Sequence, residues 1–137
     1  MGHKYQYLFY LTNNHMAEHN DLGNQGENLA AEFLEKKGFK IRHRNWVSGK
    51  KELDIVAEDG EYLVIVEVKT RSTDNFEHPK EAITNGKIKN IVSAAEEYIF
   101  QFDIMKETRF DIVSVIPERN GNFRIEHIED AFLPPVN

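Results

Sequence analysis

Four charged residues lie on either side of a turn signal, Asp59-Gly60, at spacings that could assemble a metal site. Residues two apart on a β-strand share one face of the sheet. If Asp59 and Gly60 form the loop of a hairpin, one face carries Glu52, Asp54, Glu67 and Lys69. Carboxylates on adjacent strands repel at a cost of up to roughly 1 kcal/mol per pair. A divalent cation would relieve this repulsion, and a small cluster of hard oxygen ligands suits Mg²⁺ or Mn²⁺.

The same turn predicts the register of the hairpin. The facing pairs would be Glu58 with Glu61, Asp54 with Ile65 and Glu52 with Glu67. The opposite face is then entirely apolar, with Leu53, Ile55, Ala57, Val64, Val66 and Val68. A slip of one residue would send the carboxylates into the core, so this pattern strongly constrains the register. A solvated polar face on a half-exposed hairpin has the same pattern, and the pattern alone leaves both interpretations open.

Six short motifs around the hairpin occur in a fixed order: L-G-N-Q-G-E-N-L-A at Leu22–Ala30, K-K-G-F at Lys36–Phe39, R-N-W at Arg44–Trp46, E-L-D-I-V-A at Glu52–Ala57, V-E-V-K-T-R at Val66–Arg71 and R-F-D-I-V at Arg109–Val113. The hairpin motifs resemble the core of the PD-(D/E)xK nuclease superfamily. The ordered set resembles the YraN-type family of small bacterial proteins, which is similar in turn to archaeal Holliday-junction resolvases. The chain departs from that family at Lys51, where glycine is usual.

The resemblance implies an endonuclease that depends on Mg²⁺ or Mn²⁺ and acts on structured or branched DNA in repair or recombination. The implied catalytic residues are Asp54, Glu67, Lys69, Glu52 and Glu27. Asp54, Glu67 and the Val68 carbonyl would bind the metal. Lys69 would orient the attacking water or neutralise charge on the phosphate. Glu52 and Glu27 would be further ligands or hold water. The alternative is a non-catalytic nucleic-acid-binding module, or a partner of the repair machinery, that keeps the fold.

Basic residues near the hairpin are candidate phosphate contacts. The stretch 36–51 contains seven lysines and arginines and no acid, although the whole chain has a formal net charge of −6. Local potential decides where a polyanion docks. Lys87 and Lys89 lie in the first turn of a predicted helix, where cations oppose the helix dipole and a bound phosphate would explain them. The predicted nucleic-acid contacts are Arg71, Lys87, Lys89, Arg44, Lys50 and Lys51. A solvated charged surface would look the same.

Composition indicates one globular domain in a chain of 137 residues, 29% charged and 40% hydrophobic. The absence of cysteine excludes disulfides and thiolate metal sites and fits a cytoplasmic protein. The 6 histidines lack zinc-site spacing. No apolar run approaches the ~20 residues that span a bilayer, so we expect no membrane association. His15-Met16 is typical of a cloning junction. We therefore interpret 1–15 as a leader or vector-derived segment and 16–137 as the domain.

Periodicity predicts the elements that would position the charged residues. Helices are expected over about 22–37 and 85–102, and a short helical piece over 79–83. Strands are expected over 39–44, 53–57, 62–68, 109–116 and 123–128, with a loop at the mouth of the site over 72–78. A right-handed crossover should lay 109–116 parallel to 64–69. Gly23 and Gly26 would let the first helix approach a strand or a phosphate closely.

This order of elements predicts an α/β fold with a mixed sheet of about five strands flanked by helices. The resemblance implies the restriction-endonuclease-like version of that architecture. Cleavage of a two-fold symmetric DNA junction would suit a homodimer, because symmetric substrates match symmetric proteins.

Overall fold

The computed structural model describes residues 22–71 and 83–134. Its elements are α1 (Leu22–Lys36), β1 (Lys40–Ser48), β2 (Lys51–Asp59), β3 (Tyr62–Thr70), α2 (Asn85–Phe102), β4 (Glu107–Pro117), the 3₁₀ turn η2 (Arg119–Gly121) and β5 (Phe123–Ile128). The strands form one mixed sheet in the order β1-β2-β3-β4-β5. The predicted fold class, an α/β fold with about five strands flanked by helices, is confirmed. The predicted leader 1–15, the loop 72–78 and most of the helical piece 79–83 lie outside the described residues.

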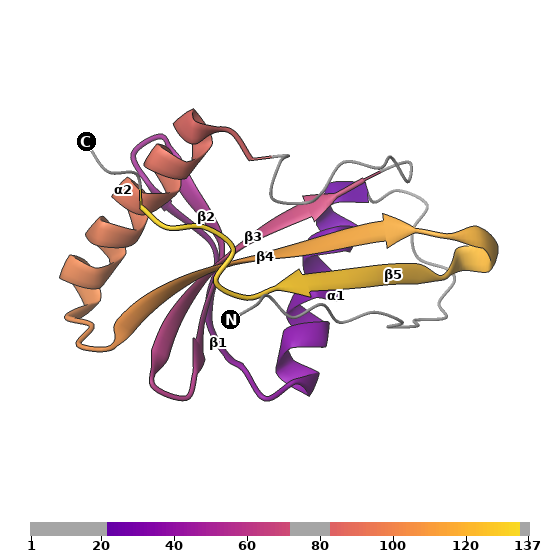
Figure 1. The fold of residues 1–137 in the computed structure, drawn as a ribbon, viewed down its shortest axis with the longest axis horizontal. Coiled ribbons are helices and arrows are strands. Elements are labelled where there is room, and N and C mark those ends of the chain that lie inside the picture. The colour runs from indigo at the N-terminus through magenta and orange to yellow at the C-terminus, as the bar shows by residue number, and fades with distance from the viewer. Residues whose placement is uncertain (1–21, 72–82, 135–137) are drawn as a thin grey trace.

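A first hydrophobic cluster fills the space between α1 and one face of the sheet. It contains Leu29, Ala30, Phe33 and Leu34 of the helix with Ile55, Ala57, Val64 and Val66 of the strands. Figure 1 shows α1 crossing behind β3, β4 and β5. The helical spacing of these apolar residues explains why α1 lies flat on the sheet. It also determines which side chains of α1 face outward.

Gly26 lets α1 approach the end of β3 closely. It is buried, and a Cβ atom at this position would overlap Oγ1 of Thr70. Only glycine, which has no side chain, fits between the helix and the strand here. The close approach expected for a glycine of this helix is therefore confirmed at Gly26. It brings the next residue, Glu27, toward the strand ends that carry the predicted acids.

A second hydrophobic cluster lies on the opposite face, beneath α2. It contains Leu53, Val56, Leu63 and Ile65 of the strands with Ile91, Ala94, Ala95 and Tyr98 of the helix. The helix begins after Thr84, whose side-chain oxygen accepts a hydrogen bond of 3.1 Å from the Lys87 N–H. This N-cap satisfies one of the free donors of the first turn. It also places the Lys87 side chain beside the sheet.

The strands β3 and β4 are parallel, as the crossover rule predicts. Their register pairs Glu67 with Ile112 and Lys69 with Ser114. Figure 1 shows the two arrows side by side and pointing the same way. The other neighbouring strands are antiparallel. Within the described residues, neither helix is long and apolar enough to cross a membrane.

The predicted hairpin register was wrong by two residues. Asp59 pairs with Tyr62, so Gly60 and Glu61 form the loop, with Gly60 at φ +60°. Glu58 consequently faces Leu63 rather than Glu61. Because side chains alternate with a period of two, a register shift of two residues does not by itself move a side chain to the other face. The corrected register moves the acid of β3 toward Asp54.

The predicted face of Leu53 was also wrong. Leu53 packs in the α2 cluster, whereas Ile55 lies in the α1 cluster. The change of face coincides with Asn45 of β1, which has φ +53° and interrupts the alternation opposite this point. The two pairs on either side of it are Arg44 with Ile55 and Trp46 with Leu53. Asp54 therefore lies opposite Asn45, between two residues of β2 that pack on different faces of the sheet.

Candidate functional site

The candidate site lies where β2 and β3 part. Ile55 and Val66 form the last pair of their ladder. Beyond it, the Val68 N–H donates a hydrogen bond of 2.9 Å to Oδ2 of Asp54. The carboxylate thus takes the place that a strand carbonyl would occupy in a continued ladder. This contact holds the Asp54 side chain at the end of the β2–β3 ladder, between the two helices.

Asp54 and Glu67 form a close carboxyl pair at this point. Glu67 is only 5% exposed, and the two carboxyl groups lie within hydrogen-bond reach of each other. Burial, and then the Glu67 charge, raise the pKa of Asp54 to about 7. Burial also raises the pKa of Glu67. Two such groups share a proton near neutral pH, because both cannot easily be ionised in contact.

Two lysines place positive charge next to Glu67. Nζ of Lys87 lies 3.2 Å from Oε2 of Glu67, and the Glu67 charge raises the pKa of Lys87. Lys69 follows Glu67 by two residues on β3, and its charge partly offsets the effect of burial on Glu67. Lys87, predicted as a phosphate contact, therefore holds an acid in this structure. Its position at the first turn of α2 depends on the Thr84 cap.

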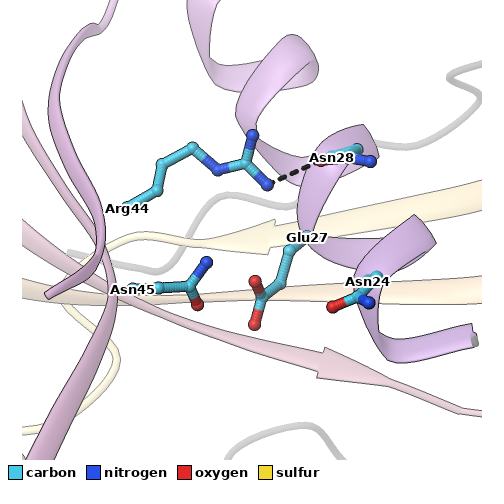
Figure 2. Close-up of a pocket in the computed structure, with 5 residues that line it drawn as sticks. All are labelled: Asn24, Glu27, Asn28, Arg44 and Asn45. Atoms are coloured by element: carbon cyan, nitrogen blue, oxygen red, sulfur yellow. Dashed lines mark hydrogen bonds between the residues drawn. The ribbon is translucent and has the colours of Figure 1, made fainter. Parts of the chain in front are cut away.

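A pocket of about 500 Å³ lies on the α1 side of the acidic pair. Figure 2 shows its lining residues: Asn24, Glu27, Asn28, Arg44 and Asn45. Nη2 of Arg44 donates a hydrogen bond of 2.7 Å to Oδ1 of Asn28. Burial, and then the charge of Asp54, raise the pKa of Glu27, whereas a hydrogen bond from Asn45 opposes the shift. The predicted residues Glu27 and Arg44 thus share one pocket near Asp54.

The remaining predicted residues differ in their exposure and in the parts of the fold that they contact. Glu52 is exposed, and its charge acts on both Asp54 and Glu27. Lys51 instead contacts α2, with its Nζ 3.0 Å from Oγ of Ser93 and 3.4 Å from Oε2 of Glu97. Lys50 lies in the exposed turn before β2, and Lys89 is exposed on α2. Arg71 follows β3, is buried, and donates its backbone N–H to the Val115 carbonyl.

Sequence reasoning missed the three asparagines of the pocket. Asn24 and Asn28 are four residues apart on α1, which puts both on one side of the helix together with Glu27. That spacing was a usable signal. Asn45 could not be recognised in this way, because its position depends on the irregular backbone of β1.

The R-F-D-I-V motif lies elsewhere in the fold. Asp111 is fully buried and accepts hydrogen bonds from Arg109, from the Asp130 N–H and from Nε2 of His127, the last at 2.8 Å. Nδ1 of His127 lies 2.8 Å from Nζ of Lys37. This network joins the end of α1 to β4 and β5. It is part of the scaffold beneath the site.

Two carboxyl groups are too few to complete the coordination shell of a metal ion by themselves. Within residues 22–71 and 83–134, no three acidic or histidine side chains come close enough together to form a metal-binding group. Mg²⁺, however, is commonly held by one or two carboxylates together with waters and substrate phosphates. Asp54 and Glu67, which lie within hydrogen-bond reach of each other at one strand junction, fit that smaller requirement.

The comparisons with known proteins agree on one protein family. The model of the uncharacterised protein family UPF0102 matches residues 26–115, which include both acids and Lys69. A UPF0102 protein of Bacteroides thetaiotaomicron is 57% identical over 121 residues, covering 88% of this chain and 99% of the relative. A UPF0102 protein of Flavobacterium psychrophilum is 51% identical over 117 residues, covering 85% and 98%. One from Parabacteroides distasonis is 46% identical over 120 residues, covering 88% and 98%.

Proposed function

The chain belongs to the uncharacterised protein family UPF0102, and from this premise we propose that it is a metal-dependent endonuclease-like protein that binds and cleaves structured DNA. The family assignment agrees with the YraN-type resemblance of its motifs. The proposed activity rests on the chemistry of the Asp54–Glu67 pair and on the likeness of the hairpin motifs to PD-(D/E)xK nucleases. We further propose that the protein acts in the cytoplasm, in DNA repair or recombination.

The carrying observation is the contact between the buried Glu67 carboxyl group and the half-buried Asp54 carboxyl group. A protein that keeps two acids together in a buried place must hold either a proton or a cation there. Mg²⁺ or Mn²⁺ is the cation that suits hard oxygen ligands. The Val68 carbonyl would add a third oxygen, because the N–H and C=O of a strand residue point to the same neighbouring strand and the Val68 N–H already points to Asp54.

The residues around the pair would serve phosphodiester hydrolysis. A bound divalent cation would lower the pKa of a bound water and stabilise charge on the phosphate. Lys69 would hold the attacking water or a non-bridging phosphate oxygen. Lys87 would be released from Glu67 once that carboxylate serves as a ligand, and could then contact a phosphate. Glu27 and Glu52 would hold water at the edge of the site.

Binding would rest mainly on contacts to the phosphate backbone. Such contacts position a nucleic acid without reading its sequence. Lys87 lies beside the acidic pair and would contact the phosphate nearest the reaction, whereas Arg44 lines the neighbouring pocket. The outer contacts would come from Lys89, Lys50 and Lys51, whereas Arg71 is buried. A homodimer would present two such sites to a two-fold symmetric junction, and sedimentation of the full chain measures that state.

One observation favours a second function, a nucleic-acid-binding module without cleavage. The Lys87 ion pair already compensates the charge of Glu67 at 3.2 Å. A module that no longer binds metal would keep its acidic pair stable in this way. Cleavage and binding assays on the same DNA separate the two functions.

The test uses synthetic four-way and flap DNA with Mg²⁺ or Mn²⁺. Wild type should cleave, whereas Asp54→Asn and Lys69→Ala should bind DNA and fail to cleave. Glu61→Gln is the matched control, since Glu61 is exposed in the turn of the same hairpin. Binding by every variant with cleavage by none would reject the enzyme and support the binding module.

A further inference from the structure

The pocket beside α1 has the size and chemistry of a ligand site. Its volume of about 500 Å³ lies within the roughly 300–1,000 Å³ range of small-molecule pockets. Three carboxamides, a guanidinium and a carboxylate line it (Figure 2). Each carboxamide offers both donors and an acceptor, the carboxylate accepts and the guanidinium donates. The pocket can therefore match a ligand that presents donors and acceptors side by side.

The lining residues are held in place before any ligand binds. Arg44 is fixed by its hydrogen bond of 2.7 Å to Asn28. Asn45 has φ +53°, a left-handed conformation that non-glycine residues adopt uncommonly and that persists where the surroundings hold it. In that conformation its amide lies beside Glu27 (Figure 2) and opposes the rise in the pKa of that carboxyl group. Figure 2 shows the side chains of Glu27 and Asn45 pointing toward each other, and the Arg44 guanidinium extending to Asn28.

The charges of the pocket favour a neutral ligand over a phosphate. Glu27 is partly buried in the lining and would repel an anion that enters. Its charge and that of Arg44 balance each other. A nucleobase is neutral, carries donors and acceptors along one edge, and stacks on guanidinium planes. Its Watson–Crick edge becomes accessible only when the base is unpaired.

We propose that this pocket binds one unpaired nucleobase of the DNA substrate, adjacent to the phosphate that lies at the Asp54–Glu67 pair. The inference rests on the proposed function and specifies its substrate: DNA with an unpaired nucleotide at the point of cleavage. The location supports it, because Glu27 lies close enough to Asp54 for the two charges to interact. Arg44 provides the stacking plane, and the asparagines bind the base edge.

Glu27 would also distinguish among the bases. A carboxylate accepts hydrogen bonds from the exocyclic amino groups of adenine, cytosine and guanine. Thymine has no such group: its single donor on that edge, N3–H, is flanked by two carbonyl oxygens that the carboxylate would repel. The pocket should therefore disfavour an unpaired thymine. Glutamine at this position would donate as well as accept, and would remove the discrimination.

The experiment measures binding without metal, so that its result does not depend on cleavage. Fluorescent DNA duplexes carry one unpaired A, C, G or T, or none, and their affinity for the full chain is measured in EDTA. Wild type should bind the A, C and G duplexes about 5–10-fold more tightly than the paired duplex, the effect of one or two net hydrogen bonds. The T duplex should bind about 3-fold more weakly than the other three.

The variants test the named residues. Asn28→Ala and Asn24→Ala should lose the preference for an unpaired base and keep the affinity for the paired duplex, and Glu27→Gln should lose only the discrimination against thymine. Gln101→Ala is the matched control, a carboxamide exposed on α2, and should behave as wild type. Equal affinity of wild type for paired and unpaired duplexes would overturn the inference, even if the protein cleaves DNA. A preference for unpaired bases in a protein that never cleaves would support the pocket and reject the nuclease.

Discussion

The Lys87 ammonium lies 3.2 Å from the Glu67 carboxylate and joins the first turn of α2 to the acidic end of β3. This ion pair links a helix cap to the candidate site, because the Thr84 side chain sets the direction of the same turn. It also explains how a buried acid stays partly charged without a metal. A buried charge without a partner is unfavourable by several kcal/mol.

Replacement of Lys87 by methionine should destabilise the protein at high pH. The lost partner leaves Glu67 and Asp54 with uncompensated charge, and we expect a loss of about 1 kcal/mol at pH 8, since Lys87 is half exposed and screened by solvent. At pH 5 the pair holds a proton and the loss should be smaller. Urea unfolding at both pH values measures this. Lys89→Met is the control, and an equal loss at pH 5 and pH 8 would contradict the assigned role.

Replacement of Asp54 by asparagine should stabilise the protein at pH 8. The pKa of Asp54 is raised to about 7, above its ordinary value of about 4. The folded state thus binds a proton that the unfolded state has lost, and stability falls as pH rises from about 4 to about 7. The asparagine removes this loss, and we expect a gain of about 2–4 kcal/mol at pH 8 and little change at pH 4. Unfolding by urea across this range measures it. A pH profile unchanged from wild type would contradict the raised pKa.

Divalent cations should stabilise wild type and leave Asp54→Asn unaffected. A ligand that binds only the folded state at 100 times its Kd adds about 2.7 kcal/mol. Protons compete for the acidic pair, so the affinity for Mn²⁺ should fall as pH decreases below about 7. Thermal unfolding with and without millimolar Mn²⁺ measures the effect. The same shift in Asp54→Asn as in wild type would place the cation elsewhere.

Replacement of Gly26 by alanine should cost about 1–3 kcal/mol, because the added Cβ atom overlaps the stiff side chain of Thr70. Thr70→Ala should recover part of the loss in the double variant. Gly86→Ala is the matched control in the other helix. Its nearest neighbour, Thr84 Oγ1, is 4.0 Å away, so the change should stabilise by about 0.5–1 kcal/mol. Chemical denaturation of the four proteins tests both directions.

Replacement of Asp111 by alanine should destabilise the protein by about 3–5 kcal/mol, because it leaves the charge of Arg109 without its buried partner. Burial alone would raise the pKa of Asp111, but hydrogen bonds from His127 and Arg109 hold it below its ordinary value. The stabilisation is therefore present above pH 4 and is lost as pH falls through the lowered pKa. Unfolding at pH 7 and pH 3 measures this. An equal loss at both would contradict the ionic role.

The sequence alone predicted the elements and the faces of the key residues. Period-two alternation put Asp54 and Glu67 on one face, and this survived a register error of two residues because such a shift preserves parity. Apolar residues at helical spacing predicted α2 from Asn85 to Phe102, which are the observed bounds. These features depend on local patterns along the chain, which can be recognised without knowledge of the tertiary contacts.

Only the tertiary structure decided how these residues meet. The contact of Asp54 with Glu67 depends on where β2 and β3 part, and the ion pair of Lys87 depends on how α2 crosses the sheet. The pocket needs α1 at the close distance that Gly26 permits and Asn45 in its left-handed conformation. Such relations join segments that are distant along the chain, and the spacing of residues within one segment carries no information about the distance to another.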